Sequence, residues 1–484
     1  MQGYHTVRFN FLGGIVSPKY LKDILEVAQN LHITKVSFGL RQQLFVYVPY
    51  NLMAQFSKAM QAQSIAFQID ENANPNIISS YVGEEVFLSG NWLTEGIYKD
   101  IFDEFDYEPR LKINVSDNQQ SFTPFFSGHL NFVSSNIPNY WYLNLRLPKT
   151  NEVHLFHNLV YSTEISKVCQ ALENQILSGN NDFASLFDQI PQRISLPVTQ
   201  ALQLPTFNLP YYEGFNRYGD KTWLGIYRRD ELFSTQFLID LCELCLDTKV
   251  GLICLTPWKS LIIKGISKEN RGRWSNLLAK HSINVRHAAN ELNWQVEDDS
   301  PEALSLKQSL IRAFDKDDLR TFGICFGIKT IPRTEVFASI MVRQRPWKWL
   351  NLIPIFKVYD ISYTQDFDPN GRTKVYFAEG VSRFNLAEQL RRSVLFYNKK
   401  IAENSLEKVE KTLKSKEAVK PIAPKVHQCK HCFTIYDAAF GDELNGIAAG
   451  IPFTKLPKTY TCPTCEAPKK DFVAVELGGV AMAI

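Results

Sequence analysis

The clearest chemistry in the sequence lies in two cysteine pairs near its end. Cys429 is paired with Cys432 and Cys462 with Cys465, with two residues inside each pair and 29 residues between the pairs. A C-x2-C pair forms a tight knuckle that directs two thiolates at one ion, and two facing knuckles complete a tetrahedron. The spacing therefore predicts a four-cysteine metal site, with zinc or a single iron as the ion.

The residues around these pairs favour iron, because the segment 425–474 resembles rubredoxin. The resemblance implies one iron ion held by four thiolates, which cycles between Fe2+ and Fe3+ and carries single electrons. Backbone donors to the sulfurs and an aromatic wall that excludes water would then set the reduction potential. The matching positions are Ile435-Tyr436-Asp437, Gly441-Asp442, Gly446-Ile447, Gly450, Phe453, Leu456-Pro457, Tyr460, Cys462-Pro463, Cys465 and Phe472.

Some positions depart from the rubredoxin pattern. Phe433 and Glu466 follow the second cysteine of each pair, where rubredoxins usually have a glycine at positive φ, and a larger residue there is strained. Tyr460 replaces a frequent tryptophan and His427 a frequent tyrosine. His427 and His431 are conceivable zinc ligands, but four cysteines leave no vacancy. We expect these departures to affect the potential and not the metal site.

The elements ahead of this segment form an internal repeat. The first copy opens with the strand VRFNFLGG and a helix that Ser17 and Pro18 should start; the second opens near 222 with WLGIYR. Both copies predict the order β-α-β-β-α, which is ferredoxin-like. The turn Gly39-Leu40-Arg41-Gln42 of the first copy aligns with Thr256-Pro257-Trp258-Lys259 of the second.

This repeat resembles the ferredoxin-like half-domains of siroheme sulfite and nitrite reductases, each of which precedes a larger α/β half. The predicted fold class is therefore α+β, with duplicated ferredoxin-like and siroheme-reductase-like halves followed by a small rubredoxin iron domain. The lysine-rich segment before the rubredoxin-like domain lacks aromatics and ends in two prolines, which predicts a tether. The predicted parts are ferredoxin-like halves at 1–75 and 206–300, reductase-like halves at 76–205 and 301–398, a charged linker at 399–424 and the rubredoxin-like domain at 425–484.

The resemblance also implies cluster ligands that the sequence does not supply. Siroheme reductases hold a [4Fe-4S] cluster with a C-x5-C and a C-x3-C pair in the second half. Cys242, Cys245, Cys254 and Cys325 do not reproduce that pattern, so we interpret them as small buried hydrophobes and expect no cluster.

The anion pocket of those reductases has few counterparts here. Arg41 matches an arginine that reaches siroheme carboxylates or the substrate anion, and the alternative is a surface turn arginine. Lys259 stands where glutamine is usual, and RLPK at 146–149 is at most a remnant of a basic loop. His154 and His157 suggest no third ligand, and no catalytic residue is identified. Siroheme remains a possible second cofactor.

Composition and charge exclude several classes. A net charge of +3 argues against nucleic-acid binding, and no run of 18 apolar residues or signal-peptide pattern occurs. The odd count of nine cysteines argues against structural disulfides. We therefore expect a cytoplasmic protein without membrane or nucleic-acid partners.

Together these features predict intracellular one-electron transfer through the iron site, in nitrite, nitrate or sulfite assimilation. The expected partners are redox proteins: a reductase as electron donor, and a nitrite, nitrate or sulfite reductase as acceptor. A carrier is favoured over an enzyme. Two alternatives stay open: a siroheme-dependent nitrite or sulfite reductase fed by its own rubredoxin domain, and a zinc-stabilised adaptor without redox activity.

Overall fold

The computed structural model describes residues 3–87, 92–190, 194–331, 336–349, 353–417 and 425–476. The chain divides into two units, 1–397 and 398–484. Within the described residues, no helix combines the length and the apolar character that crossing a membrane requires.

The first unit opens with the predicted β-α-β-β-α order. The Ser17 hydroxyl accepts a hydrogen bond from the Tyr20 amide (3.2 Å) and Pro18 is the first helical residue, so the helix begins as predicted. Leu21, Ile24 and other apolar residues at helical spacing are buried. The elements are β1 (Tyr4–Asn10), α1 (Pro18–Asn30), β3 (Lys35–Phe38), β4 (Gln43–Pro49), α2 (Met53–Ala62) and β5 (Gln68–Ile69).

The second copy repeats this order. Ser234 caps its first helix by accepting from the Phe237 amide (3.4 Å), as Ser17 does in the first copy. The elements are β12 (Gly214–Tyr218), β13 (Lys221–Ile226), α6 (Thr235–Asp247), β15 (Ile253–Leu255), β16 (Leu261–Ile266) and α7 (Arg271–Lys280).

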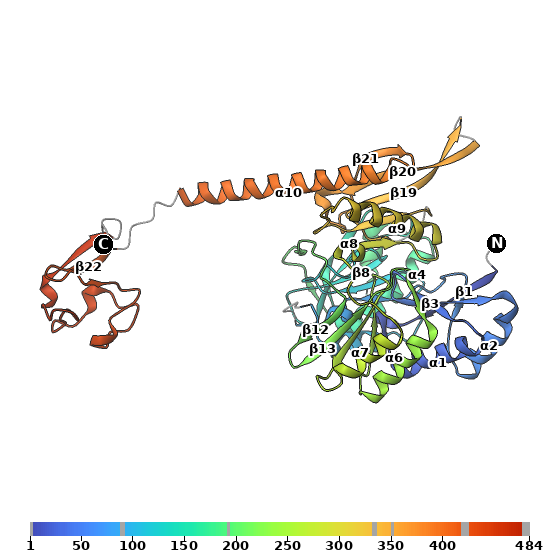
Figure 1. Ribbon diagram of the computed structural model, residues 1–484, viewed down its shortest axis with the longest axis horizontal. Coiled ribbons are helices and arrows are strands. Elements are labelled where there is room, and N and C mark those ends of the chain that lie inside the picture. The colour runs from blue at the N-terminus through green and yellow to red at the C-terminus, as the bar shows by residue number, and fades with distance from the viewer. Residues whose placement is uncertain are drawn as a thin grey trace. The chain divides into compact units, whose positions relative to one another are not determined.

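The two copies exchange an edge strand. β2 (Ile15–Val16) leaves the first copy and pairs with β15, while β14 (Leu232–Ser234) leaves the second and pairs with β3. The sheets therefore have the orders β14-β3-β4-β1-β5 and β12-β13-β16-β15-β2. Helices α1 and α6 lie side by side, and their buried residues belong to one core (Figure 1). The repeat is thus a structural duplication.

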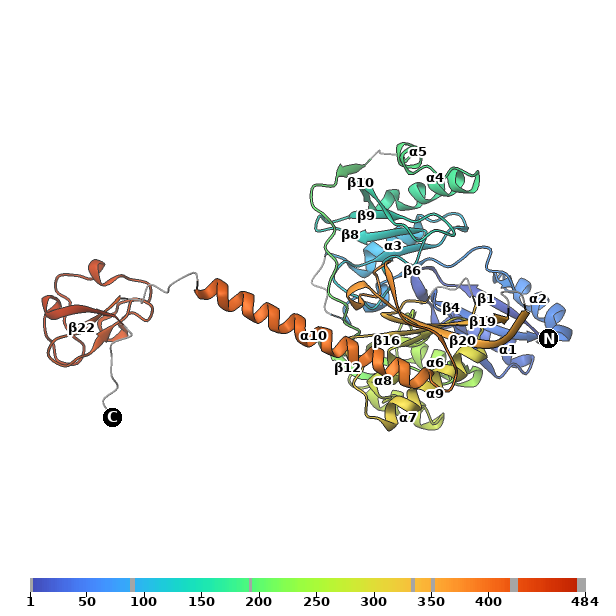
Figure 2. The ribbon, with the colours of Figure 1, turned by 90° about the horizontal axis from the view of Figure 1, so that it is seen from above.

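The larger halves are duplicated as well. In each sheet three successive strands run parallel and a fourth returns antiparallel. Figure 2 shows α4 (Ile165–Leu177) and α5 (Phe183–Asp188) beside the first of these sheets. That sheet contains β6 (Ile78–Ser79), β7 (Ile113–Ser116), β8 (Leu130–Ser134), β9 (Tyr140–Leu145), β10 (His154–Tyr161) and β11 (Ser195–Pro197), with α3 (Glu95–Asp103) between β6 and β7.

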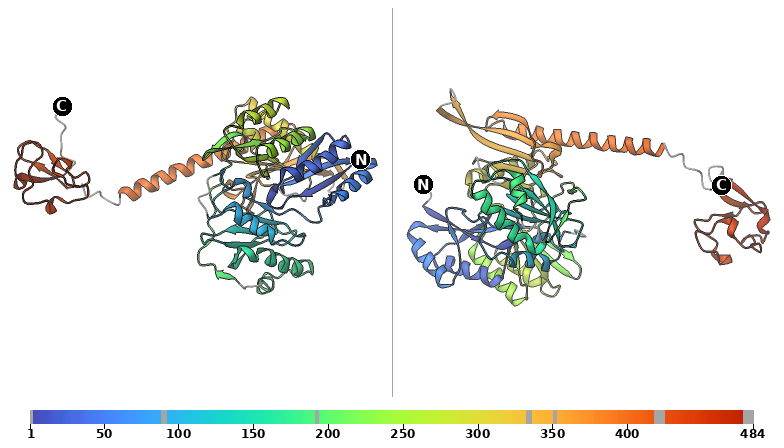
Figure 3. Two further views of the ribbon diagram at one scale, coloured as in Figure 1. Left: turned by 90° about the horizontal axis from the view of Figure 1, so that it is seen from below. Right: turned by 180° about the vertical axis from the view of Figure 1, so that it is seen from behind.

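The second large sheet differs in the length of its central hairpin. β19 and β20 have 10 and 12 residues, against five in β8 and six in β9. Figure 3 shows the longer hairpin extending beyond its sheet. The members are β17 (Trp294–Val296), β18 (Phe326–Lys329), β19 (Ile340–Trp349), β20 (Ile353–Thr364) and β21 (Lys374–Val381), with α8 (Ala289–Leu292) before β17 and α9 (Pro301–Lys316) after it.

The predicted linker is partly helical. Helix α10 spans Leu386–Glu417, and its first turns pack Leu386, Leu390 and Val394 into the core of the second large sheet. Residues 399–417 of the predicted linker therefore continue a helix, whereas 418–424 lie outside the described residues. The second unit contains β22 (Lys425–Cys429), β23 (Ile435–Tyr436) and β24 (Phe472–Glu476).

The aligned turns of the two copies have the same geometry. The Gln42 amide donates to the Gly39 carbonyl (2.9 Å), and the Lys259 amide donates to the Thr256 carbonyl (3.2 Å). Gln42 and Lys259 also share a left-handed backbone, with φ of 56° and 55°. Such a conformation costs energy in a non-glycine residue, so the surroundings of both side chains must compensate for it.

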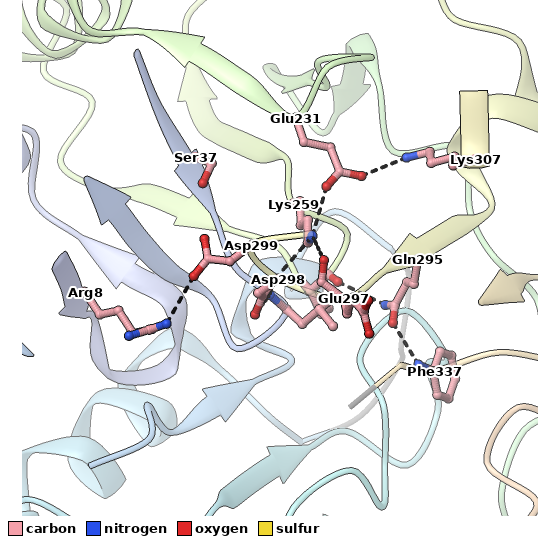
Figure 4. A network of polar contacts seen from close by, with 12 residues as sticks. Arg8, Ser37, Glu231, Lys259, Gln295, Glu297, Asp298, Asp299, Lys307 and Phe337 are labelled. Carbon is pink, nitrogen blue, oxygen red and sulfur yellow. Dashed lines mark hydrogen bonds and ion pairs between the residues drawn. The ribbon is translucent and has the colours of Figure 1, made fainter. Parts of the chain in front are cut away.

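A buried ion cluster surrounds Lys259. Its ammonium lies 2.9 Å from a Glu231 carboxylate oxygen and 3.3 Å from Asp298, and Lys307 lies 2.9 Å from the other Glu231 oxygen (Figure 4). Burial alone would raise the pKa of Glu231, but the two ammonium groups hold that pKa below its ordinary value. Glu231 therefore neutralises two lysines that are almost completely buried.

We expect Glu231→Gln to lower the free energy of unfolding by about 3 kcal/mol at pH 7, because it removes the carboxylate that Lys307 and Lys259 share and leaves Asp298 as the carboxylate partner of Lys259. Urea unfolding of the first unit measures the change. Glu243→Gln is the matched control, since Glu243 is 54% exposed and pairs with Lys22 at the surface; its effect should stay below about 0.5 kcal/mol.

The same variant should show a distinct pH dependence. The pKa of Glu231 lies below 4.5 in the folded protein, so its charge stabilises the fold above that pH, and the contribution is lost as the pH falls through the folded-state pKa. The stability difference between wild type and Glu231→Gln should therefore shrink below about pH 4. A constant difference from pH 7 to pH 3 would contradict the cluster's electrostatic role.

Candidate metal centre

The two cysteine knuckles have matching backbone hydrogen bonds. The Phe433 amide donates to the Cys429 carbonyl (3.0 Å), as the Glu466 amide does to Cys462 (2.9 Å). Cys429 is the last residue of β22, at the centre of the sheet β23-β22-β24. Phe433 and Glu466 have φ of 62° and 55°, so both keep the left-handed turn despite their side chains. Both knuckles therefore keep their turn geometry, although the left-handed backbone at these two residues is strained.

The structure brings the four sulfurs together. All four lie within 4.8 Å of one another, with Cys432 and Cys462 at 3.4 Å and Cys429 and Cys465 at 3.7 Å. A tetrahedron with metal–sulfur bonds of about 2.3 Å separates its sulfurs by about 3.8 Å. The separations therefore fit four thiolates around one ion.

The four cysteines differ in their access to solvent. Cys429 and Cys462 are buried at 0% and 1% exposure, Cys432 is half-buried and Cys465 is exposed. The centre thus has a closed side, formed by the first cysteine of each knuckle, and one edge that faces solvent.

The thiols of this edge have shifted pKa values. A hydrogen bond from the Thr434 hydroxyl, with a second from its amide, lowers the pKa of Cys432 to about 6. The pKa of Cys465 rises to about 12; the Ala467 amide lowers it, but Cys432 and the other nearby thiols raise it more. Binding of a cation must displace the remaining protons, because thiolates are the ligands.

An aromatic wall packs behind the sulfurs. Tyr436 donates to the Ile451 carbonyl (2.7 Å), and Tyr460, in the place of the usual tryptophan, donates to Asp442 (2.8 Å). Phe453 stacks on His427 at 4.0 Å. Burial lowers the pKa of His427, so this ring stays neutral at pH 7. The imidazole ring of His427 therefore takes the packing position of the tyrosine that is frequent in rubredoxins.

The cysteines of the first unit do not form a second centre in the part of the chain that the structure describes. Cys242 and Cys245 lie in the core between the repeat copies, and Cys254 and Cys325 lie in the core of the first large sheet. Burial raises the pKa of each of these thiols. Buried, protonated thiols are inert, which agrees with their interpretation as hydrophobes.

The other candidate residues also have structural surroundings. Arg41 is 4% exposed and donates to the carbonyls of Asn76 (2.6 and 2.9 Å) and Ile113 (2.9 Å), so it is not a surface arginine. His154 stacks on Phe183 at 3.6 Å. Among the described residues, neither His154 nor His157 belongs to a group of three potential metal ligands.

A basic cavity of about 560 Å³ was not anticipated as a site. It lies between the two large sheets, and its described lining contains no aspartate or glutamate. The RLPK segment contributes Arg146 and Lys149 to the lining. The other basic residues come from positions far apart in the sequence, so no local sequence motif predicts the cavity. The basic residues of the lining are Lys112, His129, Arg146, Lys149, Lys329, Arg372 and Lys374.

Sequence comparisons match the second unit. The family model of rubredoxin covers residues 426–472. The probable rubredoxin HupI of Bradyrhizobium diazoefficiens is 49% identical over 49 residues, which are 10% of this chain and 71% of that protein. The rubredoxin of Megasphaera elsdenii is 46% identical over 50 residues, which are 10% of this chain and 94% of that protein.

Structural comparison matches the first unit. The NirA protein of Mycobacterium tuberculosis superposes with a TM-score of 0.61, covering 81% of this chain and 80% of that one. The identity is 13%, so the likeness concerns the fold. It confirms the predicted fold class, in which duplicated siroheme-reductase-like halves precede a small metal domain.

We expect Cys465→Ser to abolish metal binding at this centre and to unfold the second unit, because a small domain with few buried apolar residues depends on the ion that its four cysteines bind. Metal analysis and circular dichroism of the purified variant measure both effects. The first unit has cores of its own, so its thermal transition should stay within about 2 °C of the wild type.

Cys242→Ala is the matched control, since it removes a thiol from the core of the first unit. It should lower the transition of that unit and leave the metal content unchanged. Retention of a full metal equivalent in Cys465→Ser would contradict the four-ligand site.

Proposed function

Because the chain belongs to the rubredoxin family through residues 426–472, we propose that its four clustered cysteines bind one iron ion and carry one electron at a time. The ion supplies a ferrous/ferric couple when bound. The proposed ligands are Cys429, Cys432, Cys462 and Cys465.

One observation carries the proposal: four sulfurs converge to within 4.8 Å in a fold whose relatives are rubredoxins. Thiolates delocalise charge, and a tetrahedral set changes little in geometry between oxidation states, which keeps reorganisation small. The residues Tyr436, Phe453 and Tyr460 exclude water from the closed side. Electrons then enter and leave by the edge formed by Cys432 and Cys465.

The first unit supplies the context of this transfer. We propose that its two ferredoxin-like and two reductase-like halves act as a docking platform for redox proteins of nitrite, nitrate or sulfite assimilation, with a reductase as donor. We propose the predicted ranges for these halves, with one change. Because β17 (Trp294–Val296) pairs with β18 in the second large sheet, the second reductase-like half starts before residue 294. Nine cysteines, all among the described residues and none of which forms a disulfide, support a reducing, cytoplasmic location.

A second candidate function rests on the basic cavity. Seven basic side chains around a space of about 560 Å³ suit a ligand with several carboxylates, such as siroheme, or a small oxyanion. Partial desolvation by the cavity wall and the neighbouring Arg372 and Arg343 lower the pKa of Lys374, as expected where cations lie close together. In this alternative the chain is a siroheme-dependent nitrite or sulfite reductase fed by its own rubredoxin domain.

Metal and colour test the leading proposal. Protein purified from its native host should contain about one iron per chain and no acid-labile sulfide, because a mononuclear site uses only cysteine sulfur. Its visible charge-transfer bands should bleach with dithionite. A colourless protein with one zinc would favour the adaptor, and two to four equivalents of sulfide would establish a cluster.

Turnover tests the second candidate. The chain reconstituted with siroheme and supplied with dithionite-reduced methyl viologen should not produce ammonia from nitrite or sulfide from sulfite over repeated cycles. Six-electron chemistry needs a haem coupled to a cluster, and the expected cluster ligands are lacking. Sustained product, abolished by Lys374→Ala in the basic cavity but not by Lys99→Ala on the exposed face of α3, would instead establish the reductase.

A further inference from the structure

The first knuckle has a hydroxyl two residues after its second cysteine, where the second knuckle has none. The Oγ1 atom of Thr434 lies 3.0 Å from Cys432 Sγ, two residues earlier in the chain. The left-handed turn at Phe433 folds the chain back, so that the Thr434 side chain returns to the sulfur. The equivalent position after Cys465 is Ala467, whose only donor toward that sulfur is its backbone amide.

The chemistry of the pair fixes the direction of this hydrogen bond in the loaded site. A metal-bound thiolate has no proton to give and can only accept, so the Thr434 hydroxyl must donate to Cys432. The Thr434 hydroxyl also donates to a second hydroxyl, that of Thr464 on the other knuckle, over 2.9 Å. A hydroxyl has one proton, so when Thr434 donates to the metal-bound thiolate, the Thr464 hydroxyl must donate to Thr434 Oγ1 instead. This contact holds the Thr434 side chain in the rotamer that reaches the sulfur.

A donor to sulfur acts unequally on the two oxidation states. Four thiolates give the ferric site a net charge of −1 and the ferrous site −2, so a hydrogen bond stabilises the reduced form more. Cys432 lies on the edge that faces solvent, where the added electron density is least shielded by the aromatic wall. The reduction itself adds one electron from a redox partner and forms or breaks no bond.

We propose that Thr434 is a positioning residue that raises the reduction potential of the centre by donating its hydroxyl to Cys432 Sγ, with Thr464 orienting it. The inference rests on the proposed iron site. One side chain would then adjust the reduction potential, a role that backbone amides alone would otherwise have. The two knuckles would differ in the number of hydrogen bonds that their sulfurs accept.

The test is a redox titration of the full chain and of three variants, in which the visible absorption bands report the oxidation state of the iron. Thr434→Val removes the hydroxyl and keeps the shape, so the Fe2+/Fe3+ ratio at a fixed potential should fall about tenfold, because the lost hydrogen bond stabilises the Fe2+ form more than the Fe3+ form. The sulfur-to-iron bands should shift as well. Thr434→Ser keeps the donor and should stay within about twofold.

Thr464→Val is the third variant and should lower the ratio in the same direction by less. It also tests the idea if Thr434→Val fails to retain iron, because it leaves all four cysteines and the first knuckle with Thr434 unchanged. An iron site whose ratio stays within twofold in both valine variants would overturn this inference alone. A wild-type chain without bleachable iron would overturn the proposed function, and this inference with it.

Discussion

The exchange of edge strands between the two repeat copies is the constraint on which the first unit depends. β2 is an edge strand in the sheet of the second copy, and β14 is an edge strand in the sheet of the first. Each copy therefore needs the other to complete its five-stranded sheet. The shared core between α1 and α6 follows from this arrangement. It also fixes the two aligned turns relative to the large sheets, which is why Arg41, Gln42 and Lys259 end in buried networks.

The second unit is stabilised by a different interaction. Its buried residues are few, and four sulfurs occupy the place where a larger domain would have apolar side chains. The left-handed backbone at Phe433 and Glu466 adds strain that a bound cation must offset. In the proposed function the ion would be both the redox group and a large part of the stability of this unit, so electron transfer and folding would depend on one set of contacts.

Local patterns predicted much of this structure. Helix starts at Ser17 and Ser234, the paired turns and the cysteine knuckles are set by residues within a few positions of each other. Long-range contacts escaped prediction. The burial of Arg41, the pairing of Glu231 with Lys259 and Lys307, and the basic cavity join residues that are far apart in the sequence. The Thr434 contact is local, but it requires the backbone at Phe433 to be left-handed.

The exposed edge at Cys465 has a chemical cost as well as a use. An electron crosses a short distance easily, but a peroxide molecule or an alkylating reagent reaches the same sulfur by the same opening. A ligated sulfur is less nucleophilic than a free thiolate, so the bound ion protects it. Loss of the ion leaves the neighbouring Cys432, whose pKa is lowered to about 6, as a thiolate on the same edge that can oxidise toward the sulfinic state. The lifetime of the proposed electron carrier in air would then depend on how rarely the ion leaves the site.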